Sequence, residues 1–143
     1  MRRKEGFSLV ELLIVLAVMA ALIATITPVA LNAIRKAKAT QVAQNLKTIA
    51  SAFENKLYVD GTTEITTDVS ELARDVDADN YIIAYDSNTT GEYTVTVYYK
   101  GGDVDPSSVA DVLSGATTST DRIANGVTTG TNYIYYTINI TAY

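Results

Sequence analysis

The chain has 143 residues, no cysteine, no histidine and a net charge of −5. A disulfide, a thiolate nucleophile and a histidine-based triad are therefore excluded, and a zinc site loses its usual ligands. The charge is unevenly placed: residues 57–143 carry three basic and thirteen acidic residues, whereas residues 35–56 carry five basic residues and one acidic residue. Such an acidic C-terminal part would repel nucleic acid, so we expect no direct binding to DNA or RNA.

An uncharged stretch of 23 residues, from Leu12 to Ile34, dominates the N-terminal third. As a helix it would be roughly 34 Å long, enough to cross a hydrocarbon core of about 30 Å. A buried core helix of this length would need a larger protein around it. A cleaved secretory signal would have a shorter apolar region, of roughly 7–15 residues, ending at small residues such as Ala20 and Ala24. We therefore expect a membrane-spanning helix.

One carboxylate, Glu11, interrupts the apolar run that begins at Phe7. A charged side chain near lipid is costly unless it is paired. Spacing alone leaves two interpretations open. Glu11 either reaches out to the lipid headgroups or has a dedicated partner.

Positions 2–12 have the sequence Arg-Arg-Lys-Glu-Gly-Phe-Ser-Leu-Val-Glu-Leu. This sequence resembles the class III leader and cleavage site of type IV pilins and of type II secretion pseudopilins, and the resemblance extends over residues 2–57. It implies that residues 1–6 are a leader, which a prepilin peptidase removes by cutting after Gly6. It also implies N-methylation of the new terminal residue, Phe7. Glu11 and Pro28 match the glutamate and the early helix proline of that family.

The resemblance gives Glu11 a partner. Cleavage before Phe7 creates an α-amino group, which is cationic at neutral pH. Glu11 lies one turn along the helix, where the helix dipole favours a carboxylate. In a filament, Glu11 of one subunit could neutralise the Phe7 amine of a neighbour, which would set the register of assembly. Cations flank both ends of the apolar stretch, so only the resemblance decides for a cytoplasmic leader and an exported head.

Pro28 lies inside the predicted helix. Proline removes one backbone hydrogen bond, so we expect a kink or a local opening between Ala24 and Pro28. The hydroxyls of Thr25 and Thr27 are expected to satisfy the freed carbonyls. We expect the helix to bend or stretch here on assembly.

Residues 35–57 are predicted to form an amphipathic stem helix that continues the apolar one and stops before Asp60-Gly61. Apolar residues recur at three- and four-residue spacing, so that one stripe can face a sheet while the other faces water. The stripe consists of Ala39, Val42, Ala43, Leu46, Ile49, Ala50, Phe53 and Leu57.

Residues 58–143 are predicted to form a globular head, so that the whole chain is an α+β protein with a long N-terminal helix packed against a small antiparallel sheet. Three strands are expected at residues 81–86, 92–100 and 133–142, the last two because apolar and polar residues alternate there. Asp68 and Asp105 are expected to cap short helices, and Asn125-Gly126 to form a hairpin turn. The resemblance implies a disulfide in many relatives, which pairing of the last strand must replace here.

The residues Asp75, Asp77, Asp79 and Asp86 have the spacing of a calcium loop. Asn80 occupies the position that such loops reserve for glycine, so an acidic, solvated connection is the alternative.

Two triplets, at residues 88–90 and 139–141, are N-glycosylation sequons in a host that glycosylates them. Beyond possible calcium we expect no cofactor, and no catalytic residue.

These observations lead us to expect a structural subunit of a type IV pilus-like surface filament, either a major or a minor pilin, and not an enzyme. A pseudopilin and a membrane-anchored extracellular binding domain are the alternatives. The expected partners are other copies of the chain, the prepilin peptidase, the assembly machinery and, before assembly, the membrane. The protein would span the cytoplasmic membrane once and then enter a filament on the cell surface.

Overall fold

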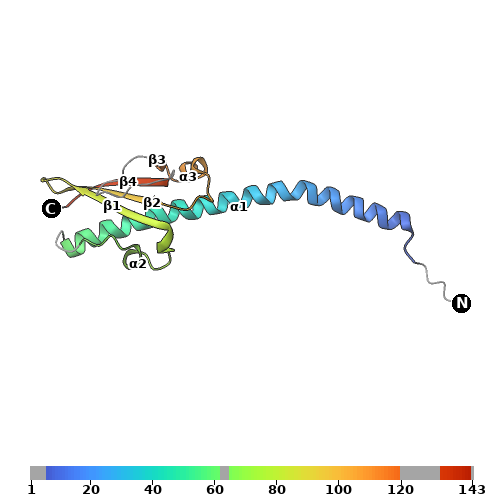
Figure 1. Ribbon diagram of the computed structural model, residues 1–143, viewed down its shortest axis with the longest axis horizontal. Helices are drawn as coiled ribbons and strands as arrows, with labels where there is room; N and C mark the ends of the chain where they lie inside the picture. The colour runs from blue at the N-terminus through green and yellow to red at the C-terminus, as the bar shows by residue number, and fades with distance from the viewer. Residues whose placement is uncertain (1–5, 62–64, 120–132, 143) are drawn as a thin grey trace. The chain divides into compact units, whose positions relative to one another are not determined.

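The computed structural model describes residues 6–61, 65–119 and 133–142. Residues 1–5 of the predicted leader and the predicted Asn125-Gly126 turn lie outside them. The chain divides into two compact units, residues 1–35 and residues 36–143. In chain order the elements are α1 (Leu9–Asp60), α2 (Val69–Leu72), the 3₁₀ helix η2 (Ala78–Asn80), β1 (Tyr81–Ser87), β2 (Glu92–Tyr99), α3 (Pro106–Val112), β3 (Thr117–Ser119) and β4 (Tyr133–Thr141) (Figure 1). This is the predicted α+β fold.

The first unit contains the N-terminal half of α1, which stays helical through Pro28. The Thr25 hydroxyl donates to the carbonyl oxygens of Ala21 and Leu22, at 3.2 and 2.9 Å. The Thr27 hydroxyl donates to the carbonyl of Ile23 at 2.7 Å. Pro28 has no backbone N–H, so the carbonyl that loses a helical hydrogen bond is that of Ala24, four residues earlier. The expectation for these hydroxyls was therefore wrong in detail, because they bond to the carbonyls of the preceding turn.

In the second unit the C-terminal half of α1 packs against the sheet, which Figure 1 shows lying along it. Every residue of the predicted apolar stripe is buried, from Ala39 to Leu57. The helix ends at Asp60, three residues beyond the predicted end. Gly61 follows with φ of +72°, a conformation that suits glycine and stops a helix.

The sheet is antiparallel with the strand order β1-β2-β4-β3. The strand β4 is interior and pairs with β2 from Glu92↔Thr141 to Tyr99↔Ile134. Thr96 and Thr137 add a side-chain hydrogen bond of 3.0 Å across this pair. A cysteine-free chain thus holds its C-terminal strand by pairing, as predicted.

Alternation in β2 and β4 divides the sheet into two faces. The inner face meets α1 in the main core and includes Val95 and Val97, each 0% exposed, as well as Ile134 and Ile140. On the other face Ala84 and Tyr98 form a second, smaller cluster with partly buried neighbours. The alternation on which these two strands were predicted thus corresponds to a buried inner face and a more exposed outer face.

Two predicted caps start the short helices. The Asp68 carboxylate accepts a hydrogen bond from the backbone N–H of Ser70 at the start of α2. Asp105 caps α3 by accepting from the N–H of Ser108, and Pro106 occupies the first turn. Aspartate at the N-cap and proline at the first helical position are both favoured in helices.

Candidate functional site

A short non-helical segment, residues 6–8, precedes α1. The Phe7 side chain is 91% exposed. A Cβ built at Gly6 would meet no heavy atom within 4 Å, and the backbone there is not in the left-handed region. No contact with the described residues therefore requires glycine at this position. A requirement for Gly6 would have to come from an enzyme that binds the Gly6–Phe7 peptide bond.

Ser8 and Glu11 cap the N-terminus of α1 reciprocally. The backbone N–H of Glu11 donates to Ser8 Oγ at 3.2 Å, and the backbone N–H of Ser8 donates to Glu11 Oε2 at 3.1 Å. This is a capping box, which satisfies two N–H groups that a helix start leaves open. Ser8 was not predicted as a capping residue, because the sequence-based interpretation of Glu11 concerned only its charge. The spacing of serine and glutamate three residues apart was the signal that could have revealed the box.

The capping box has a consequence for the peptide bond before Phe7. The cap starts the helix at Leu9, so Gly6 and Phe7 remain outside the regular helix. The same cap holds the Glu11 carboxylate against the N–H of Ser8, the residue directly after Phe7. If the chain is cut after Gly6, the new amine at Phe7 forms one residue away from a carboxylate already fixed at the helix end.

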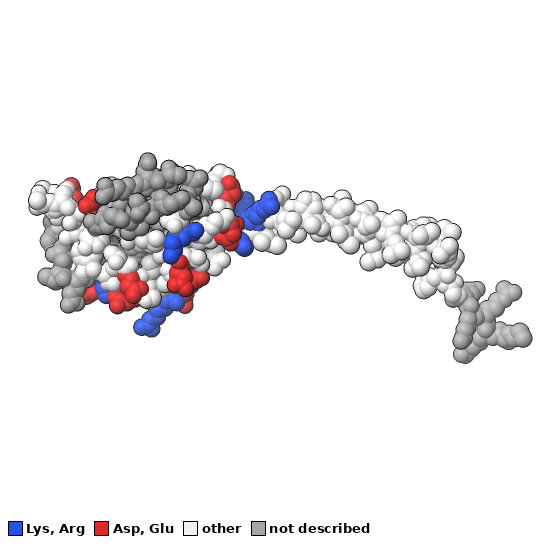
Figure 2. Space-filling view, viewed as in Figure 1, with Lys and Arg blue, Asp and Glu red and all other residues white. Residues whose placement is uncertain are grey.

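The surface of α1 from Leu9 to Ile34 is uncovered and apolar. Its large apolar side chains are all between 49% and 74% exposed, and its most apolar window has no residue buried in the chain. Glu11 is the only charged residue between Phe7 and Ile34, and Figure 2 draws this stretch almost entirely white. A continuous apolar surface of this size in a single chain indicates an apolar environment, either lipid or other helices.

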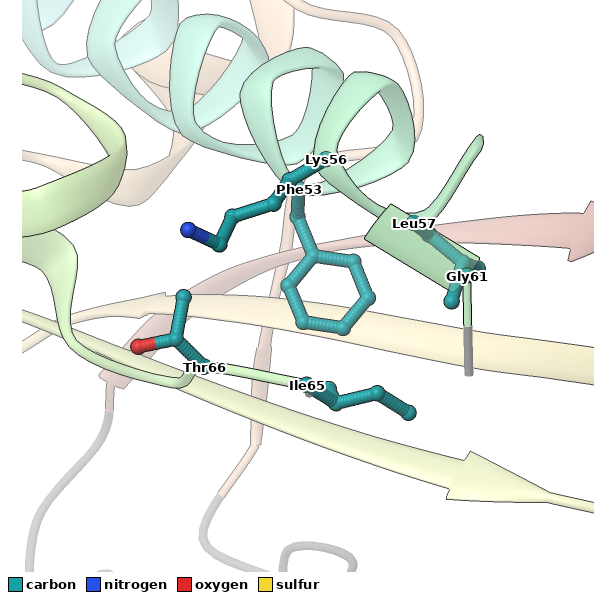
Figure 3. Close-up of a pocket in the computed structure, with 6 residues that line it drawn as sticks. All are labelled: Phe53, Lys56, Leu57, Gly61, Ile65 and Thr66. Carbon is teal, nitrogen blue, oxygen red and sulfur yellow. The ribbon is translucent and has the colours of Figure 1, made fainter. Parts of the chain in front are cut away.

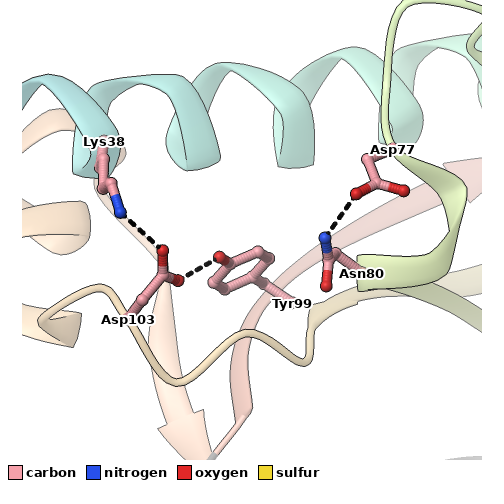
Figure 4. A network of polar contacts seen from close by, with 5 residues as sticks. All are labelled: Lys38, Asp77, Asn80, Tyr99 and Asp103. Atoms are coloured by element: carbon pink, nitrogen blue, oxygen red, sulfur yellow. Dashed lines mark hydrogen bonds and ion pairs between the residues drawn. The ribbon is translucent and has the colours of Figure 1, made fainter.

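A polar network in the second unit ties the loop after β2 to α1 (Figure 4). Lys38 Nζ lies 3.0 Å from Asp103 Oδ2, and the Tyr99 hydroxyl donates to Asp103 Oδ1 at 2.6 Å. These two bonds, chiefly the one from Tyr99, lower the pKa of Asp103. Burial, reinforced by the bond to Asp103, raises the pKa of Tyr99. The network therefore anchors the loop after β2 to α1.

The four residues of the predicted calcium loop do not come together. Asp77 caps η2, accepting from the Asp79 N–H at 3.3 Å and from the Asn80 amide at 2.7 Å. Asp86 lies five residues along β1 from Tyr81, a distance of about 16 Å in an extended strand. One ion cannot bind both ends of that strand. Among the described residues, which include all four aspartates, no three acidic side chains are grouped as metal ligands.

A small apolar pocket lies where α1 ends, between Phe53, Leu57 and Ile65 (Figure 3). Its volume is about 10 Å³. That is room for a single water at most, so this pocket does not hold a ligand.

Comparison with known proteins identifies the N-terminal segment. Residues 1–27 match the prokaryotic N-terminal methylation motif, a range that includes Gly6, Phe7 and Glu11. The chain therefore carries a class III prepilin-type leader, as in type IV pilins, and the resemblance seen in the sequence is confirmed over this range. No curated protein and no solved structure matches the chain.

This motif belongs to structural pilin-type proteins and is not an enzymatic one. A leader of this type implies processing by a peptidase and assembly into a filament. The long apolar helix that follows fits a membrane-anchored precursor.

Proposed function

We propose that this chain is a structural subunit, a major or minor pilin, of a type IV pilus-like surface filament. It is made as a prepilin, cut after Gly6, N-methylated at Phe7 and polymerised through the N-terminal half of α1. One observation carries the proposal: the methylation motif at residues 1–27 opens a helix whose large apolar side chains, from Leu9 to Ile34, are exposed.

Before assembly, residues 7–34 occupy the cytoplasmic membrane and the second unit is exported. The apolar stretch has the length that a hydrocarbon core requires. Arg35 and Lys36 end it on one side and the basic leader precedes it on the other. The prepilin peptidase and the assembly machinery meet the protein in this state.

During assembly the helix exchanges lipid for the helices of other copies. Lipid tails are as apolar as leucine, so the hydrophobic effect gives little preference for one surrounding over the other. Polar groups at the helix start therefore have a large influence on the register. Glu11 supplies the carboxylate and the Phe7 amine of a neighbouring subunit supplies the cation, two groups that are costly in an apolar filament core unless they meet.

The proposal is tested on fibres sheared from the surface of cells that produce the chain. Mass spectrometry should find this chain in them, beginning at N-methylated Phe7. Processed protein that stays with the cell envelope, combined with a secretion defect when the chain is deleted, would instead identify a pseudopilin. A chain that begins elsewhere would contradict the processing and leave a membrane-anchored binding domain.

A further inference from the structure

The two Asn-x-Thr sequons lie in different backbone environments. Asn88, Thr89 and Thr90 belong to the hairpin loop between β1 and β2 and are all exposed. Asn139 and Thr141 belong to the interior strand β4. Both asparagines line the same open groove of about 590 Å³, so a large enzyme meets them on one side of the molecule.

The hairpin loop folds around the side chain of Asn88. Asn88 Oδ1 accepts three hydrogen bonds: from the Thr90 hydroxyl at 2.7 Å, from the Thr90 N–H at 3.0 Å and from the Glu92 N–H at 3.0 Å. Asparagine readily starts such a turn, because its side chain bonds to the backbone two residues on. Gly91, with φ of +80°, completes the turn. The hydroxyl that defines the sequon thus already contacts the carboxamide.

The second sequon lacks this arrangement. In an extended strand, Asn139 and Thr141 lie on one face about 6.6 Å apart, beyond the reach of a hydrogen bond. The Asn139 side chain instead accepts a bond from the Thr94 hydroxyl of β2 at 3.1 Å. Bringing Thr141 to Asn139 would require β4 to leave β2, with the loss of the pairing that holds the C-terminal region.

We propose that Asn88 is the acceptor of an N-linked glycan and that Asn139 is not. The donor is a lipid-linked oligosaccharide diphosphate. A bond forms between the sugar C1 and Asn88 Nδ2 while the bond between C1 and the phosphate oxygen breaks. The carboxamide gives one Nδ2 proton to a base of the transferase, and the lipid diphosphate leaves. No oxidant or reductant is needed.

The folded turn is compatible with the product. Asn88 Nδ2 donates to Glu92 Oε2 at 2.6 Å, which uses one of its two protons. The glycosylated amide keeps one N–H for this bond and keeps Oδ1 as the acceptor for Thr90 and Glu92. A sugar at the exposed end of a hairpin also meets no core residue, in keeping with the surface-loop position of such acceptors.

This proposal rests on the proposed function in one respect, because it requires the second unit to be exported to the side where glycosyl transfer takes place. Export does not depend on cleavage after Gly6. The two proposals can therefore fail separately, and one mass measurement reports on both.

The test is intact-mass analysis and peptide mapping of the full chain purified from the cells that make it. The peptide containing Asn88 should carry a mass equal to a sum of monosaccharide residues. The adduct should disappear in Asn88→Gln and in Thr90→Val, which removes the hydroxyl without changing the side-chain shape. It should persist in Thr90→Ser and in the matched control Asn139→Gln.

Three outcomes overturn the proposal: an unmodified Asn88 peptide from a chain whose head is accessible to external protease, an adduct on Asn139, or full modification of Thr90→Val. An adduct at Asn88 on a chain that still begins at Met1 would support glycosylation and contradict the proposed processing. Near-ultraviolet circular dichroism of each variant shows whether its fold is retained.

Discussion

Ser8 and Glu11 hydrogen-bond to each other through both of their backbone N–H groups, at 3.2 and 3.1 Å. Glu11 thus has a partner within its own chain before any filament forms. The cap holds its carboxylate at the helix start, beside the position where cleavage would create the Phe7 amine. A neighbouring subunit that pairs with Glu11 would have to compete with the Ser8 N–H or share the carboxylate with it.

The first prediction separates the charge of Glu11 from its capping bond. Glu11→Val should leave membrane insertion and cleavage intact but abolish fibres, because a neighbour's amine would remain unpaired in an apolar core. Breaking such a pair typically costs about 3–5 kcal/mol for each subunit added. Glu11→Gln keeps an acceptor for the Ser8 N–H and loses only the charge. Fibre yield by quantitative immunoblot of sheared fractions should fall in both variants; normal yield in Glu11→Gln would show that the cap, not the charge, is what assembly needs.

The second prediction concerns Gly6. Because a Cβ at this position would touch none of the residues that the structure describes, Gly6→Val should leave the fold unchanged and yet block removal of the leader. Intact mass should then find a precursor that begins at Met1 in the membrane fraction, with more than a tenfold loss of processed chain. Normal cleavage of Gly6→Val would mean that the peptidase does not need glycine here.

The third prediction uses two adjacent glycines as a matched pair. A Cβ at Gly101 would clash with the Tyr99 hydroxyl, whereas a Cβ at Gly102 would meet no heavy atom within 4 Å. Gly101→Ala should force Tyr99 away from Asp103 and destabilise residues 36–143 by about 1–3 kcal/mol. Gly102→Ala should change the free energy of unfolding by less than about 0.5 kcal/mol. Urea unfolding of both variants provides the comparison, and equal effects would remove the role given to Gly101.

Periodicity made the helix stripe and the strand faces predictable. The stripe from Ala39 to Leu57 has one spacing, that of a helix, and the alternation in β2 has one spacing, that of a strand, so each pattern fits only one structure. The strand β3 was not foreseen, because Thr117–Ser119 is short and polar and gains its structure only by pairing with β4.

Sequence patterns did not predict contacts between residues that are far apart in the sequence. Lys38 and Asp103 are 65 residues apart in the sequence, and the residues around each of them form no pattern that predicts the ion pair. The calcium spacing from Asp75 to Asp86 is a local pattern that predicted one loop, whereas the structure places Asp86 within the extended strand β1. At the N-terminus the motif was specific enough to predict the leader, whereas the capping bonds between Ser8 and Glu11 were missed.

The fourth prediction concerns calcium. Since Asp77 caps η2 and Asp86 lies far along β1, calcium at millimolar concentration should shift the Tm of residues 36–143 by less than about 1 °C. Asp77→Ala should lower the Tm equally with and without calcium, because it loses a cap worth about 1 kcal/mol. Magnesium is the control for ionic strength. A calcium-specific rise in Tm that Asp77→Ala abolishes would restore the predicted site.

The last prediction is a pH dependence from Asp103. Bonds from Tyr99 and Lys38 lower its pKa below the ordinary 3.8. A carboxyl whose pKa is lower in the folded state than in the unfolded state stabilises the fold above the unfolded pKa, and this contribution disappears as the pH falls through the folded pKa. The stability of residues 36–143 should therefore decline below about pH 4, in part because of Asp103. An ion pair this exposed contributes no more than about 1 kcal/mol, so the effect is small.

Tyr99→Phe and Lys38→Met each remove one of these bonds, and each should flatten the decline between about pH 4 and pH 2, Tyr99→Phe more strongly. Asp105, whose pKa is also lowered but by the capping bonds of α3, provides the comparison: its contribution should survive in both variants. Urea unfolding at a series of pH values measures the slope. If the free energy of unfolding of Tyr99→Phe falls with decreasing pH as steeply as that of the unaltered protein, the hydroxyl bond to Asp103 contributes nothing to stability in solution.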